Sequence, residues 1–350
     1  MAPHGGLTEG LPMQTMQLNG SLQIPAKDNG DMTLTVLGCG TLGIAILSGI
    51  LSSVSSLKTQ ASSTSGTTTP SEDLPPRTPS RFLACVTRPQ SAKRIKVELS
   101  HLTDSLSVLQ NDNVRGVREA DVVLLACKPY NLAAVLEEEG MREALQGKLL
   151  ISILAGVPVS QIGDTIYGAG SNQSLPPDPA VNGRCRIVRV MPNTASLICE
   201  SMTVIADSNP PLTQPLNALV TWMFSRIGRV VHLPPAQMDA STALCGSGPA
   251  FFALVLEAMA DGAVAMGLPR AEAQLMAAQT MKGTASLVLN GEHPALVREK
   301  VSTPGGCTIG GLLVLEEGRV RGTVARSVRE ATVVASQLGM GVKGVNGTRF

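Results

Sequence analysis

The sequence predicts an α/β fold in which an N-terminal domain with a parallel sheet is followed by an all-α C-terminal domain. Three observations support this prediction. A β-prone run leads through a glycine-rich turn into a helix-like run, several later apolar runs of strand length end in small or polar residues, and the pattern becomes mostly helical after residue 208. The 350 residues exceed a typical domain of about 100 to 200 residues. We therefore expect a disordered tail over 1–30, a sheet domain over 31–208 and a helical domain over 209–350.

The first strand is expected at Thr33–Leu37, and the first helix at Ile44–Leu51. Between them lies a GxGxxG pattern, in which the first glycine permits a tight turn, the second admits a pyrophosphate and the third lets helix and strand pack closely. The pattern alone is weak in a chain with 35 glycines, but here it stands between strand and helix. It predicts a Rossmann-like dinucleotide-binding domain. The expected cofactor-binding residues of this turn are Gly38, Cys39, Gly40, Thr41 and Leu42.

The second strand is expected at Phe82–Thr87, after an insertion over about 52–80 that is rich in Ser, Thr and Pro. An acidic residue usually follows this strand and holds the ribose hydroxyls of NAD, but this chain has Arg88 there. A guanidinium suits a 2'-phosphate, so we expect NADPH as the cofactor, with NADH possible. Ser91, Lys93 and Arg94 follow and also suit a 2'-phosphate, but a solvated basic helix start is the favoured interpretation of Lys93 and Arg94.

Three further runs, Ala120–Cys127, Leu149–Leu154 and Arg186–Met191, resemble strands buried on both faces. Parallel strands bind ligands at their carboxyl ends, so the residues that follow them are expected at one edge of the sheet. A second insertion, over about 168–183, is rich in Gly, Asn, Ser and Pro. The expected cofactor-binding residues at this edge are Ala126, Lys128, Pro129, Ala155, Gly156 and Asn193.

The helical domain is expected to contain a long helix after Ser247, which would act as its cap, a second helix over Pro269–Asn290 and a third from about Thr308. Nearly every face of the first helix is apolar, so it must lie deep in the protein or against another subunit. A homodimer or higher homo-oligomer is therefore expected, and a core formed within one chain is the alternative.

Composition excludes several classes of function. A net charge of +1 without a sustained basic run argues against nucleic-acid or membrane partners. The seven cysteines form no CxxC pair and the four histidines have no metal-ligand spacing, so no metal site is expected, and the thiols suggest burial in a reducing compartment. The first thirty residues carry only Lys27 as a cation, which argues against a targeting peptide and favours a cytoplasmic protein.

The segment Ser302–Thr308 places a glycine-rich turn directly before an apolar run. Amides of such a turn form an anion-binding concavity, and the following helix adds the positive end of its dipole. The segment is therefore a candidate carboxylate site, although a Pro-Gly-Gly turn that merely starts a helix has the same pattern. Its candidate substrate-binding residues are Thr303, Gly305, Gly306, Cys307 and Thr308.

Several segments together resemble the pyrroline-5-carboxylate reductase family over about Thr33–Val334. They are the glycine fingerprint, CKPY at Cys127–Tyr130, LAGV at Leu154–Val157, MPNTA at Met191–Ala195, CGSGPAFF at Cys245–Phe252, DGAVAMGLPR at Asp261–Arg270 and STPGGCTIGGL at Ser302–Leu312. The last of these is the most specific, and the first is shared by many dehydrogenases. The two insertions and Cys307, where the family commonly has alanine or threonine, depart from the pattern.

The resemblance implies NADPH-dependent reduction of the cyclic imine 1-pyrroline-5-carboxylate to L-proline, at a site where helices of two subunits meet beside the cofactor. It implies that amides around Gly306 and Cys307 bind the substrate carboxylate, that the Thr308 hydroxyl bonds the ring nitrogen and that Lys128 lies near the cofactor ribose or phosphate. Thr308 is the one expected catalytic residue. Should Cys39 be exposed beside the pyrophosphate, its oxidation would block cofactor binding.

Two other functions are considered. A 3-hydroxyacid dehydrogenase also joins a Rossmann domain to a helical one, but that class resembles this architecture with a lysine after the domain junction, and Gly246–Gly267 contains none. A non-catalytic NADPH-sensing module is the alternative from another class, and the intact Ser302–Thr308 segment argues against it.

Overall fold

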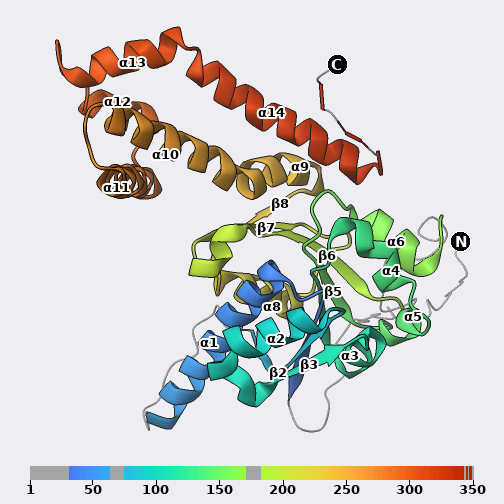
Figure 1. The fold of residues 1–350 in the computed structure, drawn as a ribbon. Helices are drawn as coiled ribbons and strands as arrows, with labels where there is room; N and C mark the ends of the chain where they lie inside the picture. The colour runs from blue at the N-terminus through green and yellow to red at the C-terminus, as the bar shows by residue number, and fades with distance from the viewer. Residues whose placement is uncertain (1–30, 64–74, 171–182, 343, 346, 349–350) are drawn as a thin grey trace, which may run out of the picture.

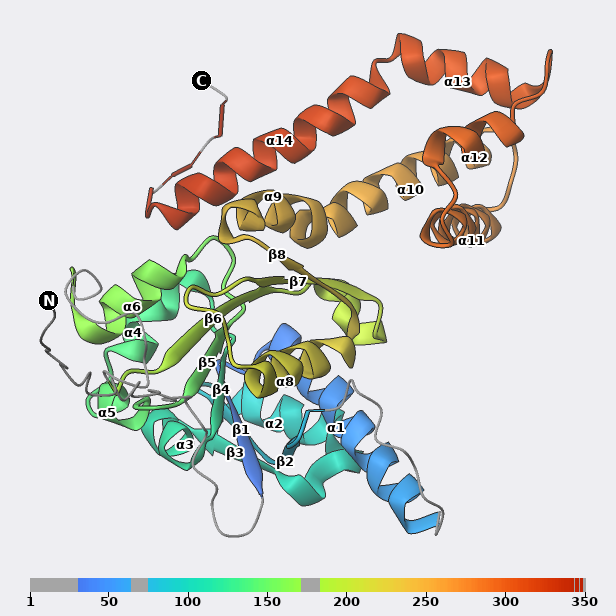
Figure 2. The ribbon, with the colours of Figure 1, turned by 180° about the vertical axis from the view of Figure 1, so that it is seen from behind.

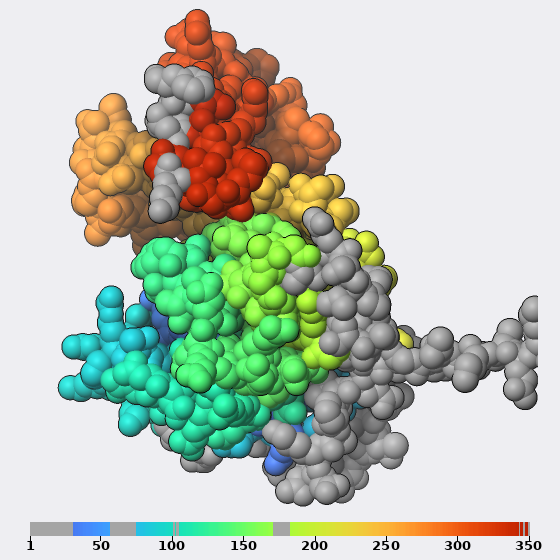
Figure 3. All heavy atoms as spheres, turned by 90° about the vertical axis from the view of Figure 1, so that its right-hand side faces the viewer, coloured from blue at the N-terminus to red at the C-terminus, as the bar shows by residue number. Residues whose placement is uncertain are grey.

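The computed structural model describes residues 31–63, 75–170, 183–342, 344–345 and 347–348. The predicted tail over 1–30 and the middle of both predicted insertions lie outside these residues. The described chain has a lower part built on a sheet and an upper part made of helices, and Figure 3 shows the helical part, in orange and red, standing on the sheet part.

One eight-stranded sheet forms the lower part, with the strand order β3-β2-β1-β4-β5-β6-β7-β8 (Figure 2). The first six strands are parallel, β7 runs antiparallel to β6, and β8 runs parallel to β7. The order 3-2-1-4-5-6 is that of a Rossmann domain, so the predicted fold class is confirmed. The strands are β1 Met32–Leu37, β2 Pro79–Val86, β3 Leu106–Gln110, β4 Val122–Leu125, β5 Leu149–Ser152, β6 Arg186–Met191, β7 Ser201–Ala206 and β8 Gly228–Leu233.

Helices cover both faces of this sheet (Figure 1), and each face has its own apolar core. Side chains of α1, α2 and α8 fill one core, where Phe82 and Phe224 are fully buried, and side chains of α3 to α6 fill the other. The helices are α1 Thr41–Ser63, α2 Pro89–Glu98, α3 Asn113–Glu119, α4 Leu132–Leu136, α5 Met141–Ala144, α6 Val159–Tyr167 and α8 Gln214–Ser225.

Two predicted boundaries of the sheet domain are wrong. Helix α1 continues to Ser63 and β2 begins at Pro79, so only the middle of the segment 52–80 is left for an insertion. The division predicted after residue 208 falls inside the sheet part, because α8 buries Leu219, Val220 and Phe224 in the core under α1 and β8 pairs with β7. Residues Arg229–Leu233 belong to the sheet as well, since they lie in β8.

The helical part starts with one long helix that passes through a π-helical turn, Thr242–Ser247. The regular helix α10 begins directly after Ser247, as predicted, but Ser247 itself has helical dihedral angles and makes no capping bond, so its predicted role as the cap is wrong. The predicted helix over Pro269–Asn290 is confirmed by α11, and the helix expected from about Thr308 is confirmed by α13. The helices are α9 Met238–Ser241, α10 Gly248–Ala265, α11 Arg270–Leu289, α12 Pro294–Lys300, α13 Cys307–Glu317 and α14 Val320–Gly339.

The helical part leaves large apolar side chains in water. Phe252 is 58% exposed, Met266 86%, Leu275 69% and Leu313 57%. Among the described residues, the helix Pro235–Ala265 is also long and apolar enough, by length and composition alone, to cross a membrane. A surface of this extent marks an interaction site rather than a finished monomer surface.

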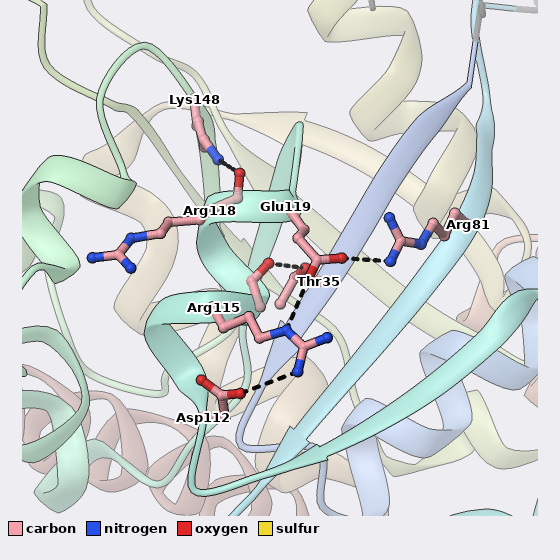
Figure 4. Close-up of polar contacts among 8 residues, drawn as sticks. Thr35, Arg81, Asp112, Arg115, Arg118, Glu119 and Lys148 are labelled. Carbon is pink, nitrogen blue, oxygen red and sulfur yellow. Dashed lines mark hydrogen bonds and ion pairs between the residues drawn. The ribbon is translucent and has the colours of Figure 1, made fainter.

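The outer side of α3 carries a network of charged groups, which Figure 4 shows in close-up. Arg115 lies between Asp112 and Glu119, and Arg81 of β2 pairs with Glu119 from the other side. Partial burial raises the pKa of Glu119, but hydrogen bonds from Arg115 and Arg81 outweigh it, and the pKa lies below its usual value. These bonds are local to the outer surface and tie α3 to the sheet.

The crossing of α1 and the segment before β8 gives a test of the packing. A Cβ atom on Gly49 would lie 2.6 Å from Ile227 Cγ2 and 3.0 Å from the Arg226 carbonyl oxygen. We expect Gly49→Ala to lower the free energy of unfolding by roughly 1–3 kcal/mol through overpacking, although alanine favours helix. Ser48→Ala, one residue away and half-buried, is the control and should change it by less than about 0.5 kcal/mol in urea unfolding. Equal stabilities for both variants would contradict the close packing.

Candidate functional site

The turn after β1 requires glycine at its first position. Gly38 has a φ of +73°, and a Cβ atom there would lie 2.6 Å from Cys127 Cα at the end of β4. The amides of Gly38 and Cys39 both donate to the Cys85 carbonyl oxygen at 3.1 Å, which binds the turn to the end of β2. The turn is therefore fixed between the ends of β2 and β4.

The turn leads directly into the N-terminus of α1, where the backbone is open to a ligand. The Gly40 carbonyl accepts the first helical bond, from Ile44 N at 2.9 Å, and a Cβ atom on Gly40 would meet nothing nearer than 3.9 Å. Gly43 is different, because a Cβ atom there would lie 3.2 Å from Val36 Cγ1. The second glycine thus leaves room for an anion and the third serves packing, so these residues fit the pyrophosphate of a dinucleotide.

Cys39 points away from this opening. Its side chain is 1% exposed, and burial raises the pKa of its thiol to about 12, with Cys85 adding to the rise and Arg94 opposing it. The condition under which oxidation of Cys39 was expected to block cofactor binding, an exposed thiol, is therefore not met. Cys199 and Cys307 are exposed, so the expectation of buried thiols fails for these two.

The ends of β4 and β2 bring further predicted residues to the same edge. The Ala126 amide donates to the Leu37 carbonyl oxygen at 2.9 Å, which places Ala126 beside the glycine turn. Lys128 and Pro129 follow at the exposed start of a 3-10 turn, and Arg88 is exposed at the start of α2, where its side chain makes no capping bond. Cationic side chains thus flank the open N-terminus of α1.

Two other predicted residues lie where the sheet part meets the helical part. Asn193 follows β6, and its side-chain oxygen accepts from the Ala195 amide at 3.0 Å. Gly156 has a φ of +73° and packs on α14, where a Cβ atom would lie 3.2 Å from the Ala335 carbonyl oxygen, while its neighbour Ala155 is exposed. Gly156 is thus held by packing against a helix.

The π-helical turn Thr242–Ser247 also reaches this edge, which the sequence reasoning missed. Met238 is fully buried in a small core with Met191, the last residue of β6, and a Cβ atom on Gly246 would lie 3.9 Å from Met191 Sδ. An ion pair of 3.2 Å between Arg189 of β6 and Asp239 of α9 fixes the foot of the helix. Turns of this kind are frequent at functional sites, and the glycines and serine inside an apolar helix were the available signal.

The candidate carboxylate site has the predicted local form. Gly305 has a φ of +69°, the Gly306 amide donates to the Thr303 carbonyl oxygen at 3.0 Å, and α13 begins at Cys307. The first amides of a helix have no partner within it. No hydrogen bond joins the Thr308 hydroxyl to another described residue, and Thr308 is the second helical residue rather than the cap. Amides and a hydroxyl are therefore available to an anion.

Within one chain, however, the structure does not bring the two groups of predicted residues together. The segment between α12 and α13 lies at the far end of the helical part in both Figure 1 and Figure 2, well away from β1 and the start of α1. The residues Thr303–Thr308 therefore lie remote from the turn Gly38–Leu42 of the same chain.

Two family models match the chain. The model described as "Pyrroline-5-carboxylate reductase dimerisation" matches residues 235–338, and the model described as "NADP oxidoreductase coenzyme F420-dependent" matches residues 33–156. The first covers the helical part and the second covers the glycine turn and the strands on either side of it.

Similar proteins are found over the full length of the fold. A pyrroline-5-carboxylate reductase of Lophium arboricola is 63% identical over 325 residues, covering 93% of this chain and 99% of its own. One from Neurospora crassa is 54% identical, covering 92% and 98%. The solved structure of a 1-pyrroline-5-carboxylate reductase of Streptococcus pyogenes superposes with a TM-score of 0.67 at 25% identity, covering 88% of this chain and 99% of its own.

The burial of Cys39 can be tested by labelling. Because its pKa lies near 12, the thiol stays protonated at lower pH, and at pH 8 about one molecule in 10⁴ carries the reactive thiolate. We expect iodoacetamide at pH 8 to alkylate the exposed Cys199 rapidly and to leave Cys39 unmodified in the folded protein, as read by mass spectrometry of peptides. Alkylation of both at equal rates would contradict the buried position, and labelling of both in urea is the control.

Proposed function

The chain belongs to the pyrroline-5-carboxylate reductase family, and from that membership we propose how its residues reduce 1-pyrroline-5-carboxylate to L-proline, the last step of proline biosynthesis. Relatives above 50% identity over nine-tenths of the chain argue against both alternatives, the 3-hydroxyacid dehydrogenase and the non-catalytic NADPH-sensing module. The observation that carries the assignment of residues is the turn before α13, with its open amides and free Thr308 hydroxyl.

NADPH binds at the glycine turn and, when bound, supplies the hydride. The open backbone at Gly40 and the N-terminus of α1 receive the pyrophosphate. Arg88 recognises the 2'-phosphate, because it stands at the end of β2 where an acid would serve NAD. The rest of the carboxyl edge of the sheet is lined by Ala126, Lys128 and the residues that follow β5 and β6.

The substrate is held by the turn before α13. Amides of Cys307 and Thr308, the first two of α13, bind the carboxylate, and the helix dipole adds to the attraction. The Gly306 amide, which was expected to bind it as well, already donates to the Thr303 carbonyl oxygen. The protonated ring nitrogen donates a hydrogen bond to Thr308 Oγ1, which keeps the imine carbon electrophilic. As that carbon accepts hydride, the electron pair of the C=N double bond moves to nitrogen, and the nitrogen keeps its proton. No acid or base side chain is needed, so alignment supplies most of the catalysis.

A second copy of the chain completes the site. The turn and the cofactor edge lie apart in one chain, and the apolar faces of α10, α11 and α13 are exposed. Docking of two helical parts covers those faces and carries the turn of one chain to the cofactor edge of the other. The same docking covers the apolar side chains of the helix Pro235–Ala265, so its composition requires no membrane.

A cytoplasmic location fits the thiol chemistry. All seven cysteines are unpaired in the structure, which is the usual state in a reducing compartment.

The role of Thr308 can be tested with a pair of variants. Loss of a hydrogen bond to a charged group costs about 1.5–3 kcal/mol, so we expect Thr308→Ala to lower kcat by about 10- to 100-fold while the fold and the oligomer stay intact. Thr308→Ser keeps the hydroxyl and should retain most of the activity. The readouts are NADPH oxidation, circular dichroism and size-exclusion chromatography. An unchanged kcat in Thr308→Ala would remove the residue from the mechanism.

The role of Arg88 can be tested by comparing the two cofactors. Removing the guanidinium should raise the KM for NADPH by about 10- to 100-fold in Arg88→Ala and leave the KM for NADH nearly unchanged, because only NADPH carries the 2'-phosphate. Lys93→Ala, an exposed cation on the same helix, is the matched control. Equal rises for the two cofactors would contradict the assignment.

A further inference from the structure

Arg94 reaches the glycine turn from the neighbouring helix. It belongs to α2, yet its Nη1 donates to Thr41 Oγ1 at 3.0 Å, and Thr41 is the first residue of α1. The sequence favours a solvated surface position for this arginine, whereas the structure joins it to Thr41 of the fingerprint. The bond links two helices through residues that are 53 positions apart in the chain.

The guanidinium is held in this position from its other side. Arg94 Nε donates to Glu98 Oε1 at 2.6 Å, one helical turn further along α2. The side chain of Arg94 is 43% exposed, so one flank faces solvent, and its Nη2 makes no hydrogen bond within the described part of the chain. Glu98 therefore orients the group and leaves part of its donor edge open.

The charge of Arg94 acts on the glycine turn itself. Burial chiefly raises the pKa of the Cys39 thiol and Cys85 adds to the rise, while the positive charge of Arg94 works against both. Cys39 lies between Gly38 and Gly40, so the positive charge of Arg94 acts at this turn. The bond to Thr41 gives the same result by geometry.

We propose that Arg94 is a second anion-binding residue of the cofactor site, which orients the Thr41 hydroxyl and contributes positive charge to the pyrophosphate. This inference rests on the proposed function of the glycine turn. A hydroxyl that accepts from Arg94 can point its own hydrogen at a phosphate oxygen, and the unbonded Nη2 adds a donor with charge. The pyrophosphate sits at the N-terminus of the first helix in this fold, and Thr41 stands at that end.

Arg88 and Arg94 thus have separate tasks. Arg88 follows β2, where the 2'-phosphate distinguishes NADPH from NADH. Arg94 contacts the start of α1, where the pyrophosphate binds, and both NADPH and NADH contain that group. Loss of Arg94 should therefore weaken both cofactors equally, whereas loss of Arg88 weakens only NADPH.

The test is the dissociation constant of the oligomeric protein for NADPH and for NADH, measured by nucleotide fluorescence without substrate. In Arg94→Met both constants should rise about tenfold, the loss expected for one charge-assisted hydrogen bond, with their ratio unchanged. Thr41→Val should raise both by a smaller factor, and Arg94→Lys should recover part of the loss. The control is Arg115→Met, which breaks the equivalent ion pair between Arg115 and Glu119, four residues apart on the outer side of α3, and should change neither dissociation constant.

Unchanged constants in Arg94→Met would overturn the inference, and so would a loss confined to NADPH, which would place Arg94 with Arg88 at the 2'-phosphate. Absence of NADPH binding by the unaltered protein would instead overturn the proposed function.

Discussion

Within one chain, the helical part cannot bury its own apolar surface. Phe252, Leu275 and Leu313 are each more than half exposed. Burying one such side chain is worth about 1.5–3 kcal/mol, so covering many of them strongly favours association. The helices that carry these side chains also carry the turn before α13. The association that covers the side chains therefore also sets the position of that turn.

The sheet part supplies the fixed end of this arrangement. Arg189 of β6 pairs with Asp239 at the foot of the long helix, and Met238 packs against Met191 beside it. The end of α14 rests on Gly156, where each backbone comes too close to the other for a side chain. The helical part is thus anchored directly beside the carboxyl ends of the strands, and its free end holds the turn before α13 away from them.

Elements that depend on a local sequence pattern could be predicted from the sequence. The glycine fingerprint predicted a strand, a turn and a helix, and the structure has all three, because the positive φ of Gly38 and the open face of Gly40 are local requirements. Features that depend on long-range packing were missed. Helix α8 joins the core of the sheet part through contacts with α1, and the π-helical turn arises inside an apolar run. The bond from Arg94 to Thr41 spans two helices and leaves no trace in the pattern of either.

In the proposed arrangement, each active site takes its cofactor edge from one chain and its substrate turn from another. The most direct test is to co-express a Gly40→Val chain, whose cofactor edge is blocked, with a Thr308→Ala chain under a second tag, and to isolate the mixed dimer. One of its two sites then combines the intact edge of one chain with the intact turn of the other, so about half of the unaltered activity should return. If the edge and the turn of one chain act together, every site in the mixed dimer has one defect, and activity no higher than that of the two parent variants would contradict the account.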